Sequence, residues 1–362
     1  MSRFHPLTVA AVQPETREAV LVSFAVPETL RETFRFAAGQ HLTLRTNIAG
    51  EDVRRSYSIC SGERDGDLRI IVKRVPGGLF SSFAASALKP AAILDVMPPT
   101  GHFTLPPDAG PAAGRKRAYA AFAAGSGITP VFSLIKTALE REPECRFTLF
   151  YGNRASSSVI LRGALADLKD RYLERLVLVH VMSREHQDIE LLNGRITAEK
   201  CRRLLAHFAP AAEIDLFFVC GPGPMMTAVI EALSAEGVAD DRIRIERFAT
   251  SGAPRTAAPP THAVIGEAAC GVEVVQDGRR RHFTLEKGKS SLLEAGLAEG
   301  LDLPYSCKSG VCSTCRCKLI EGDVDMDVNF ALEDYEVKRG FILACQSYPV
   351  SDRVVIDYDQ DA

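Results

Sequence analysis

The chain has 362 residues, of which 46% are hydrophobic and 25% charged, and its formal net charge is −3. That length allows two or three domains of ordinary size, each with its own core, and the composition is ordinary for a soluble globular protein. No apolar run approaches the roughly eighteen residues that a membrane helix needs, and residues 1–6 lack an apolar signal core. We therefore expect a cytoplasmic protein with neither a membrane nor a nucleic-acid partner.

Charge is distributed unevenly along the chain. Acidic side chains outnumber basic ones by seven over residues 262–362, whereas basic side chains are in excess by four over the first 261 residues. The acidic part could attract the rest of the chain or steer a basic partner toward it. For each single charge, a solvated surface explains the pattern as well.

Residues from about 7 to 107 form short alternating or β-branched runs, such as 19–24, 41–44 and 68–73. Glycine and proline residues separate these runs at close intervals. The pattern predicts a small antiparallel barrel.

Two motifs in this region indicate a flavin dinucleotide site. Arg55 and Tyr57 lie on one face of a predicted strand, because side chains alternate along it. A guanidinium suits a pyrophosphate, an aromatic ring stacks on a flat cofactor, and the Ser58 hydroxyl suits a ring nitrogen. Glycines at 77–78 then lead into a helix expected to begin at Ser81, which is a good place for an anion. A core tyrosine is the alternative explanation for Tyr57.

The pattern of apolar and polar residues changes after residue 114. An apolar run at 117–124, too short for an ordinary helix, ends in the glycine-containing segment 125–130, and an amphipathic helix follows with Pro130 near its start. Further strand-like runs are separated by helical patterns. The strand-like runs are 145–151, 176–182, 216–220 and 243–248, and the helical patterns are 160–172, 197–208 and 224–235. This alternation predicts a parallel sheet covered on both faces.

A segment of small residues and prolines at 250–261 has no periodicity and is expected to be a tether of moderate stiffness. It implies a domain organisation of 1–110 for the barrel, 111–249 for the parallel-sheet domain and 262–362 for a last domain. The tether would allow the last domain to move.

Four cysteines in the last domain follow the spacing C-x4-C-x2-C-x29-C. They are Cys307, Cys312, Cys315 and Cys345. This is the thiolate arrangement of plant-type ferredoxins, which bind a 2Fe–2S cluster. The alternatives are buried free thiols or a zinc site, although zinc usually draws on two short cysteine pairs. Cys317 is expected to be a core residue, and the scattered remaining cysteines favour a reducing compartment.

Four motifs, taken in order, resemble those of the ferredoxin–NADP reductase superfamily over roughly residues 7–248: R-x-Y-S at 55–58, G-x-x-S at 78–81, the segment 125–130, and Cys220-Gly221-Pro222. The resemblance implies an antiparallel flavin-binding barrel and a Rossmann-like nucleotide domain, followed by a C-terminal β-grasp ferredoxin domain. With that last domain, the chain looks like a single-component reductase for a multicomponent oxygenase.

The resemblance also implies a role for individual residues. It assigns Arg55, Gly78 and Ser81 to the FAD pyrophosphate, Tyr57 and Ser58 to the isoalloxazine, Val72 and Lys73 to backbone contacts, Phe248 to the flavin face, Gly125, Gly127, Thr129 and Pro130 to the nicotinamide cofactor's phosphates, and Cys220 and Gly221 to the nicotinamide. Tyr57, Ser58 and Cys220 are the catalytic candidates. For Cys220, a packing role at the end of a buried strand is equally consistent.

The cofactor preference depends on Arg154 and on the pair Ser183-Arg184. In family members that use NADPH, such a Ser-Arg pair binds the 2′-phosphate, whereas an NAD site more often offers an acid to the ribose. We expect NADPH, with exposed surface arginines as the alternative. NADPH gives two electrons and the cluster accepts one at a time, so FAD is the converter between them.

The electron acceptor is expected to be a partner protein. The chain lacks the Glu-x-x-His pair of a di-iron site, and no output module for a redox regulator is found. Segments 4–9, 39–44 and 322–326 resemble the reductase subunits of phenylacetyl-CoA epoxidases, which implies the oxygenase component of a multisubunit di-iron monooxygenase as partner. A steroid hydroxylase, a ring-hydroxylating dioxygenase or a fatty-acyl desaturase remains open. A candidate docking rim consists of Glu321, Asp323, Asp325, Asp327, Glu333, Asp334 and Glu336.

Overall fold

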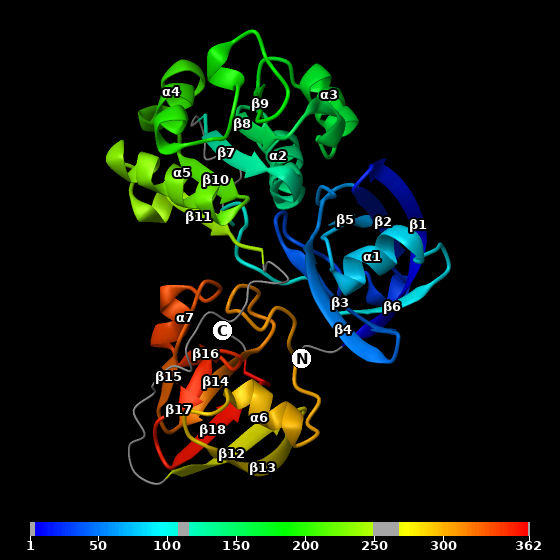
Figure 1. Ribbon diagram of the computed structural model, residues 1–362, viewed down its shortest axis with the longest axis vertical. Helices are drawn as coiled ribbons and strands as arrows, with labels where there is room; N and C mark the ends of the chain where they lie inside the picture. Colours follow the sequence, from blue (N-terminus) through cyan, green and yellow to red (C-terminus); the bar gives the residue numbers. More distant parts are fainter. Residues whose placement is uncertain (1–3, 108–115, 249–267, 361–362) are drawn as a thin grey trace.

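The computed structural model describes residues 4–107, 116–248 and 268–360. The described chain forms three parts, each built on its own sheet (Figure 1). The expected domain boundary at residues 110–111 and the expected tether at 250–261 lie outside the described residues.

The first part is the expected antiparallel barrel. Its elements are β1 (His5–Thr16), β2 (Ala19–Ala25), η1 (Glu28–Leu30), β3 (His41–Ile48), β4 (Glu51–Ser58), β5 (Leu68–Lys73), α1 (Leu79–Ser86) and β6 (Ile93–Val96). The strand order is β4-β3-β6-β1-β2-β5. An additional antiparallel bridge between Ile59 and Ile70 joins the two ends of the sheet and closes the barrel. Helix α1 begins at Leu79, two residues before the expected start, because Gly78 serves as its N-cap.

Strand β3 shows why the barrel forms. Leu42 and Leu44 are fully buried in the barrel core, and the residues between them point to the opposite face. That outer face pairs across to β4 as His41 with Ser58, Thr43 with Ser56 and Arg45 with Arg54. Strand β3 is therefore apolar on its inner face and polar on its outer face.

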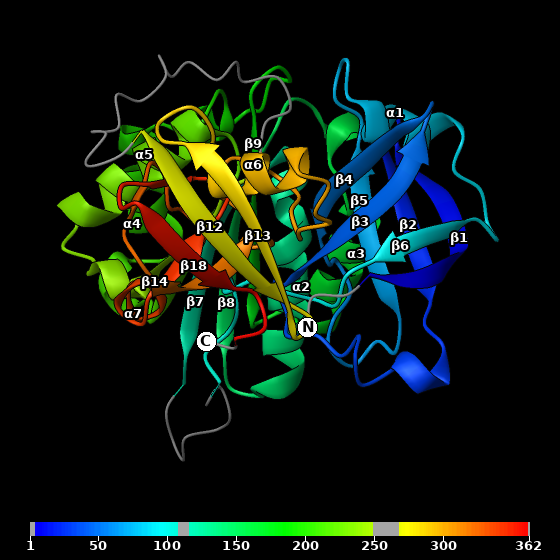
Figure 2. The ribbon, with the colours of Figure 1, turned by 90° about the horizontal axis from the view of Figure 1, so that it is seen from below.

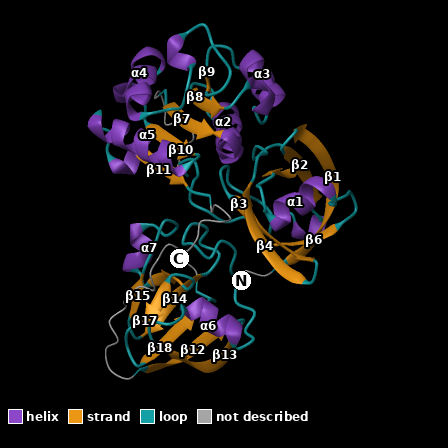
Figure 3. Ribbon diagram, in the orientation of Figure 1, coloured by secondary structure: helices purple, strands orange, loops and turns teal. Residues whose placement is uncertain are grey.

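The second part is the expected parallel sheet, with strand order β11-β10-β7-β8-β9. Its strands are β7 (Ala118–Ala124), β8 (Arg146–Asn153), β9 (Leu176–Met182), β10 (Leu216–Cys220) and β11 (Ile243–Glu246), and all neighbouring pairs are parallel. Helices α2 (Ile128–Arg141) and α3 (Arg162–Arg171) cover one face, and α4 (Ala198–Phe208) and α5 (Gly223–Ala235) cover the other (Figure 3). Short 3-10 turns lie at η2 (Gly125–Gly127), η3 (Ser156–Ser158), η4 (Glu190–Leu192), η5 (Ala211–Glu213) and η6 (Asp240–Arg242).

The barrel and the parallel sheet share a continuous core. Ala38 and Ile71 of the barrel belong to the same buried cluster as Val131 and Leu134 of α2. These two parts are therefore packed firmly against each other through helix α2.

The third part is the C-terminal domain, with the expected β-grasp architecture. Its elements are β12 (Ala269–Gln276), β13 (Arg279–Glu286), α6 (Leu292–Ala298), β14 (Arg316–Glu321), β15 (Val324–Met326), α7 (Asp334–Lys338), β16 (Phe341–Leu343), β17 (Ser347–Pro349) and β18 (Arg353–Asp357). The mixed sheet has the order β13-β12-β18-β14-β16, in which only β12 and β18 are parallel. Helix α6 packs on this sheet, and Ser291 caps it by accepting a hydrogen bond from the Glu294 amide.

Figure 2 views the molecule from the side of the C-terminal domain, whose strands β12 and β13 lie nearest the reader.

Within the described ranges, none of the helices combines the length and the apolar character needed to cross a bilayer.

Candidate functional site

Two loops of the parallel-sheet domain meet at the carboxyl ends of β7 and β10. A Cβ atom added to Gly127 would lie 2.2 Å from the carbonyl oxygen of Cys220, so only glycine allows the loops to approach this closely. Gly125 has a φ of +54°, and the Thr129 hydroxyl donates to the Ser126 carbonyl at 2.9 Å. Pro130 is buried in the first turn of α2. The structure thus brings together the residues predicted for the cofactor's phosphates.

Cys220 and Gly221 form the other side of this junction. A Cβ atom on Gly221 would lie 2.6 Å from Met225 Cε and 3.2 Å from the Ala124 amide nitrogen. The Cys220 side chain is fully buried, and burial together with the nearby Glu246 carboxyl raises the pKa of its thiol well above the ordinary value. Cys220 is therefore a neutral thiol.

The residues predicted for the 2′-phosphate also lie together, after β8 and β9. The Ser183 hydroxyl donates to the Asn153 carbonyl at 3.2 Å, and the Arg184 amide donates to the Arg154 carbonyl at 2.8 Å. All three predicted side chains are exposed. Arg154 Nη1 lies 3.8 Å from Glu18 Oε1 of the barrel.

On the barrel, α1 and β4 carry the residues predicted for FAD. The Tyr57 ring lies 5.4 Å from that of Phe80, and the Arg55 guanidinium donates to the Arg54 carbonyl at 2.7 Å. The Ser81 hydroxyl accepts from the Val75 amide at 3.1 Å and donates to the Gly78 carbonyl at 3.2 Å. This hydroxyl therefore shapes the turn before α1.

Three further predicted residues lie at the end of β5 and at the end of the described parallel-sheet domain. Val72 is fully buried in β5. Lys73 Nζ lies 3.4 Å from the position of a Cβ on Gly125, and burial lowers the pKa of this amine. Phe248 is exposed at the end of the described parallel-sheet domain. Lys73 thus reaches from the barrel toward the glycine loop.

Glu246 is a candidate that the sequence analysis missed. Its carboxyl is buried at the last residue of β11, with both oxygens 3.4 Å from Ser58 Oγ and one 4.0 Å from His41 Nδ1. Burial raises the pKa of Glu246 to about 8 and lowers that of His41 to about 4, so both groups are neutral at pH 7. The only signal in the sequence is an acid ending a β-branched run just before Phe248.

Replacing Glu246 with glutamine is expected to remove a pH dependence of stability. Between the unfolded pKa of 4.5 and about pH 8, the folded protein keeps a proton that the unfolded chain releases, so the free energy of unfolding falls as the pH rises. Each pKa unit corresponds to about 1.4 kcal/mol. The advantage of Glu246→Gln over wild type should therefore be small at pH 5 and grow to several kcal/mol at pH 8, as measured by urea unfolding.

The matched control is Glu231→Gln, which neutralises an exposed carboxylate on α5. This variant should show the same pH slope as wild type. Equal slopes for wild type and Glu246→Gln would contradict the assignment.

The four cysteines of the C-terminal domain form two pairs. The Cys307 amide donates to Cys312 Sγ at 3.4 Å. The Cys312 thiol stabilises the Cys307 thiolate, and the Cys315 thiol stabilises the Cys345 thiolate. The Cys312 thiol, with help from amide groups of the loop, lowers the pKa of Cys307 to about 5. Two cysteines for each of two irons is the ligand set of a 2Fe–2S cluster.

The backbone of the cysteine loop turns its amides toward sulfur. Lys308, Gly310 and Ser313 have φ values of +51°, +73° and +49°, and the Ser309 amide donates to Cys307 Sγ at 3.3 Å. In the described ranges, no group of three or more His, Cys, Asp or Glu side chains is arranged to hold a single metal ion. Cys317 is buried in the domain core. The residues present fit a cluster with two ligands on each iron.

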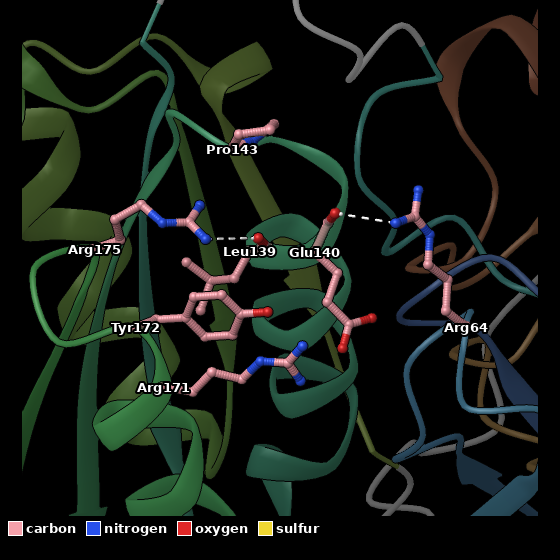
Figure 4. Close-up of a pocket in the computed structure, with 7 residues that line it drawn as sticks. All are labelled: Arg64, Leu139, Glu140, Pro143, Arg171, Tyr172 and Arg175. Carbon is pink, nitrogen blue, oxygen red and sulfur yellow. Dashed lines mark hydrogen bonds between the residues drawn. The ribbon is translucent and has the colours of Figure 1, made fainter.

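A pocket elsewhere, formed by the parallel-sheet domain together with Arg64 of the barrel, contains none of the predicted residues (Figure 4). It is lined by Arg64, Leu139, Glu140, Pro143, Arg171, Tyr172 and Arg175. Arg175 donates to the Leu139 and Glu142 carbonyls at 2.9 Å, and its guanidinium stacks on Tyr172. A cation bound to the last carbonyls of a helix stabilises that helix, so we assign a structural role to this group.

Comparisons with known proteins agree with this geometry. Models of three families match in order: an oxidoreductase FAD-binding domain at residues 6–105, an oxidoreductase NAD-binding domain at 122–231, and a 2Fe-2S iron-sulfur cluster binding domain at 274–350. The solved structure of phthalate dioxygenase reductase superposes with a TM-score of 0.58 and 21% identity over 98% of both chains, which supports the fold.

Two curated relatives align along almost the whole chain. A component of 1,2-phenylacetyl-CoA epoxidase from Escherichia coli is 46% identical over 99% of both chains. The ferredoxin reductase component of 3-ketosteroid-9-alpha-monooxygenase from Rhodococcus rhodochrous is 36% identical over 99% of this chain and 97% of its own. The chain therefore belongs to this family of oxygenase reductases, flavin and iron–sulfur oxidoreductases that relay electrons from NAD(P)H through FAD to a 2Fe–2S cluster.

Proposed function

We propose that this reductase takes electrons from NADPH and delivers them singly to the oxygenase component of a phenylacetyl-CoA epoxidase, a multisubunit di-iron monooxygenase. The observation that carries the proposal is the 46% identity to the Escherichia coli epoxidase component along 99% of both chains. The 36% identity to the steroid monooxygenase component makes a steroid hydroxylase the second candidate partner.

On the barrel, the Arg55 guanidinium and the first turn of α1 would hold the FAD pyrophosphate. Helix α1 has no side-chain cap, which leaves its first amide groups available to an anion. Ser81 contributes by fixing the turn at Gly78, and Tyr57 offers a ring beside Phe80. Val72 and Lys73 would contribute backbone contacts, and Phe248 an aromatic face.

Bound FAD would convert the two-electron donation of NADPH into single electrons. The protein positions the cofactors and holds a proton: Ser58 and the protonated Glu246 lie side by side where β4 and β11 end. The neutral Cys220 thiol would pack beside the nicotinamide and help to exclude water. We therefore propose an orienting role for Cys220 and no nucleophilic one.

The junction of Gly125, Gly127, Thr129 and Pro130 with Gly221 would receive the cofactor's phosphates. Arg154, Ser183 and Arg184 would bind the 2′-phosphate, because hydrogen bonds hold the backbone segments that carry these three exposed side chains next to each other after β8 and β9. The Glu185 carboxylate, the nearest acid in sequence, already accepts hydrogen bonds from the amide and the hydroxyl of Ser156. This arrangement favours NADPH over NADH.

Replacing Arg184 with alanine is expected to raise the KM for NADPH about ten- to a hundredfold, because a hydrogen bond to a charged group contributes about 1.5–3 kcal/mol. The KM for NADH should change little, since NADH lacks the 2′-phosphate. Steady-state kinetics with both cofactors measures the difference. Arg202→Ala, at an exposed position of α4, is the control. Equal losses with both cofactors would contradict the role.

Two pairs of cysteines would hold the cluster, with one iron bound by Cys307 and Cys312 and the other by Cys315 and Cys345.

The predicted acidic rim around this loop needs one correction. Glu336 is fully buried, accepts from Arg316 Nη1 at 2.6 Å and lies 3.4 Å from His102 Nε2 of the barrel part. It therefore belongs to an internal contact and is not available to a partner protein.

Anaerobic stopped-flow absorbance tests the whole proposal. The protein as purified is mixed with NADPH and with NADH, and the reduced protein is then mixed with the oxygenase component of a phenylacetyl-CoA epoxidase or of a 3-ketosteroid monooxygenase. Rapid flavin bleaching, then cluster bleaching, then reoxidation by the epoxidase component alone is the expected result. Reoxidation by the steroid component alone would reassign the partner.

A further inference from the structure

The outer face of the β3–β4 hairpin contacts the C-terminal domain along its length. The Thr43 hydroxyl lies 3.1 Å from that of Thr314, and the Ser56 hydroxyl donates to that of Ser306 at 2.9 Å. His41 forms a hydrogen bond with the backbone of Cys312. The cysteine loop is therefore turned toward the barrel.

This contact lies close to the residue proposed to contact the flavin ring, Ser58. His41 pairs directly with Ser58, and residues paired in this way have Cα atoms about 5 Å apart. Ser58 is in turn beside Glu246. The orientation in the structure is thus one in which electrons could pass directly from FAD to the cluster.

Arg54 makes the most extensive contact between the two domains. Its guanidinium donates to Asp302 Oδ1 at 2.7 Å and to the Leu303 carbonyl at 3.1 Å, and it stacks over the Tyr305 ring at 4.3 Å. On its own strand it donates to Asp52 at 3.0 Å. Only 5% of the Arg54 side chain is exposed, so contact with the C-terminal domain removes this cation from water. The same domain supplies most of the groups that replace water around the guanidinium.

The neighbouring arginines 54 and 55 serve opposite faces. Strand alternation directs Arg54 to the C-terminal domain, whereas Arg55 lies on the opposite face of the strand, where it is proposed to hold the FAD pyrophosphate. Arg45, across the hairpin, also reaches Asp302, at 3.4 Å. Asp302 is therefore a carboxylate that contacts two arginines of the barrel, Arg45 and Arg54.

We propose that Arg54 is the clamp that holds the C-terminal domain on the β3–β4 hairpin, so that the Arg54–Asp302 contact positions the cluster to receive electrons from FAD. The inference rests on the proposed sites of the two cofactors. Arg54 is a positioning residue, since it acts on the placement of a domain and touches neither reacting centre.

The contacts predict graded effects. Asp302 is 70% exposed, and Arg54 retains Asp52 and the Leu303 carbonyl without it, so Asp302→Asn should slow flavin-to-cluster transfer no more than about threefold. Asp302→Arg places a third cation against Arg54 and Arg45, and it should slow transfer at least tenfold. Combining it with Arg54→Asp restores opposite charges and should recover part of the loss.

The test uses the full-length protein with both cofactors. Anaerobic stopped-flow measures flavin reduction and cluster reduction separately, and small-angle X-ray scattering measures the radius of gyration. Asp302→Arg should leave flavin reduction and the cluster spectrum unchanged, slow cluster reduction and increase the radius of gyration. Glu286→Gln, at an exposed position of β13 in the same domain, is the control and should match wild type.

Wild-type transfer together with a wild-type radius of gyration in Asp302→Arg would overturn the clamp. Slowed transfer without expansion, or an altered cluster spectrum, would also overturn it, because the substitution would then act within its own domain. If the cluster of the wild-type protein is not reduced, the proposed cofactor sites are contradicted instead. The comparison of radii of gyration would still test whether Arg54 holds the C-terminal domain.

Discussion

Replacing Cys312 with alanine is expected to remove the visible absorbance of the cluster and to lower electron delivery beyond FAD more than a hundredfold. The structure pairs Cys312 with Cys307, so one iron would lose half of its protein ligands. Reduction of FAD by NADPH should persist, because the barrel and the parallel sheet have cores separate from that of the C-terminal domain. Iron content, absorbance and flavin reduction are the three measurements.

Cys317→Ala provides the matched control. Cys317 lies two residues after Cys315 and is 1% exposed in the domain core, where it contacts Tyr358. Its truncation should cost about 1–2 kcal/mol of stability, as small deletions from a packed core do, and should leave the iron content unchanged. Two irons retained by Cys312→Ala, or lost by Cys317→Ala, would contradict the ligand assignment.

Replacing Gly127 with alanine is expected to reduce the rate of flavin reduction by NADPH about a hundredfold. The added Cβ would lie 2.2 Å from the carbonyl oxygen of Cys220 and 2.6 Å from its carbonyl carbon, and both are backbone atoms that cannot rotate away. The two loops must then separate, and a misplacement of about 1 Å can cost a factor of about a hundred in rate. Overpacking should also cost about 1–3 kcal/mol of stability.

Gly223→Ala, at the start of α5, is the control for this prediction. No atom lies within 4 Å of the Cβ that it would add, so stability and flavin reduction should match wild type. Single-turnover kinetics at saturating NADPH separates a loss of geometry from a loss of affinity. A Gly127→Ala enzyme with wild-type kinetics would show that the two loops need not approach this closely during hydride transfer.

Much of the fold could be read from local patterns. The alternation at Leu42 and Leu44 identified the barrel strand, and the strand–helix alternation after residue 114 identified the parallel sheet, because side-chain periodicity is a property of each element by itself. The helical pattern predicted from residue 197 corresponds to α4, which begins one residue later because Thr197 is its N-cap. The expected start of α1 was two residues late, since the cap there is a glycine with no side chain to mark it.

The candidate site was predicted where its residues are close in sequence. The cysteine loop and the glycine segment at 125–130 each carry their spacing within a few residues, so their chemistry is visible before folding. Glu246 was missed because Ser58, its hydrogen-bond partner, lies 188 positions earlier in the chain. Glu336 was wrongly counted with the acidic rim because its burial depends on Arg316 and on His102, which belongs to another domain.

Periodicity and motif spacing are encoded over short stretches of chain, and they were enough to predict the three folds, the order of the domains and the types of cofactor. The contact between the polar face of β3 and β4 and the C-terminal domain, with Arg54 buried against Asp302, became visible only in the folded molecule. Strand alternation shows which residues share a face, whereas what covers that face depends on surfaces brought together from about 250 positions apart.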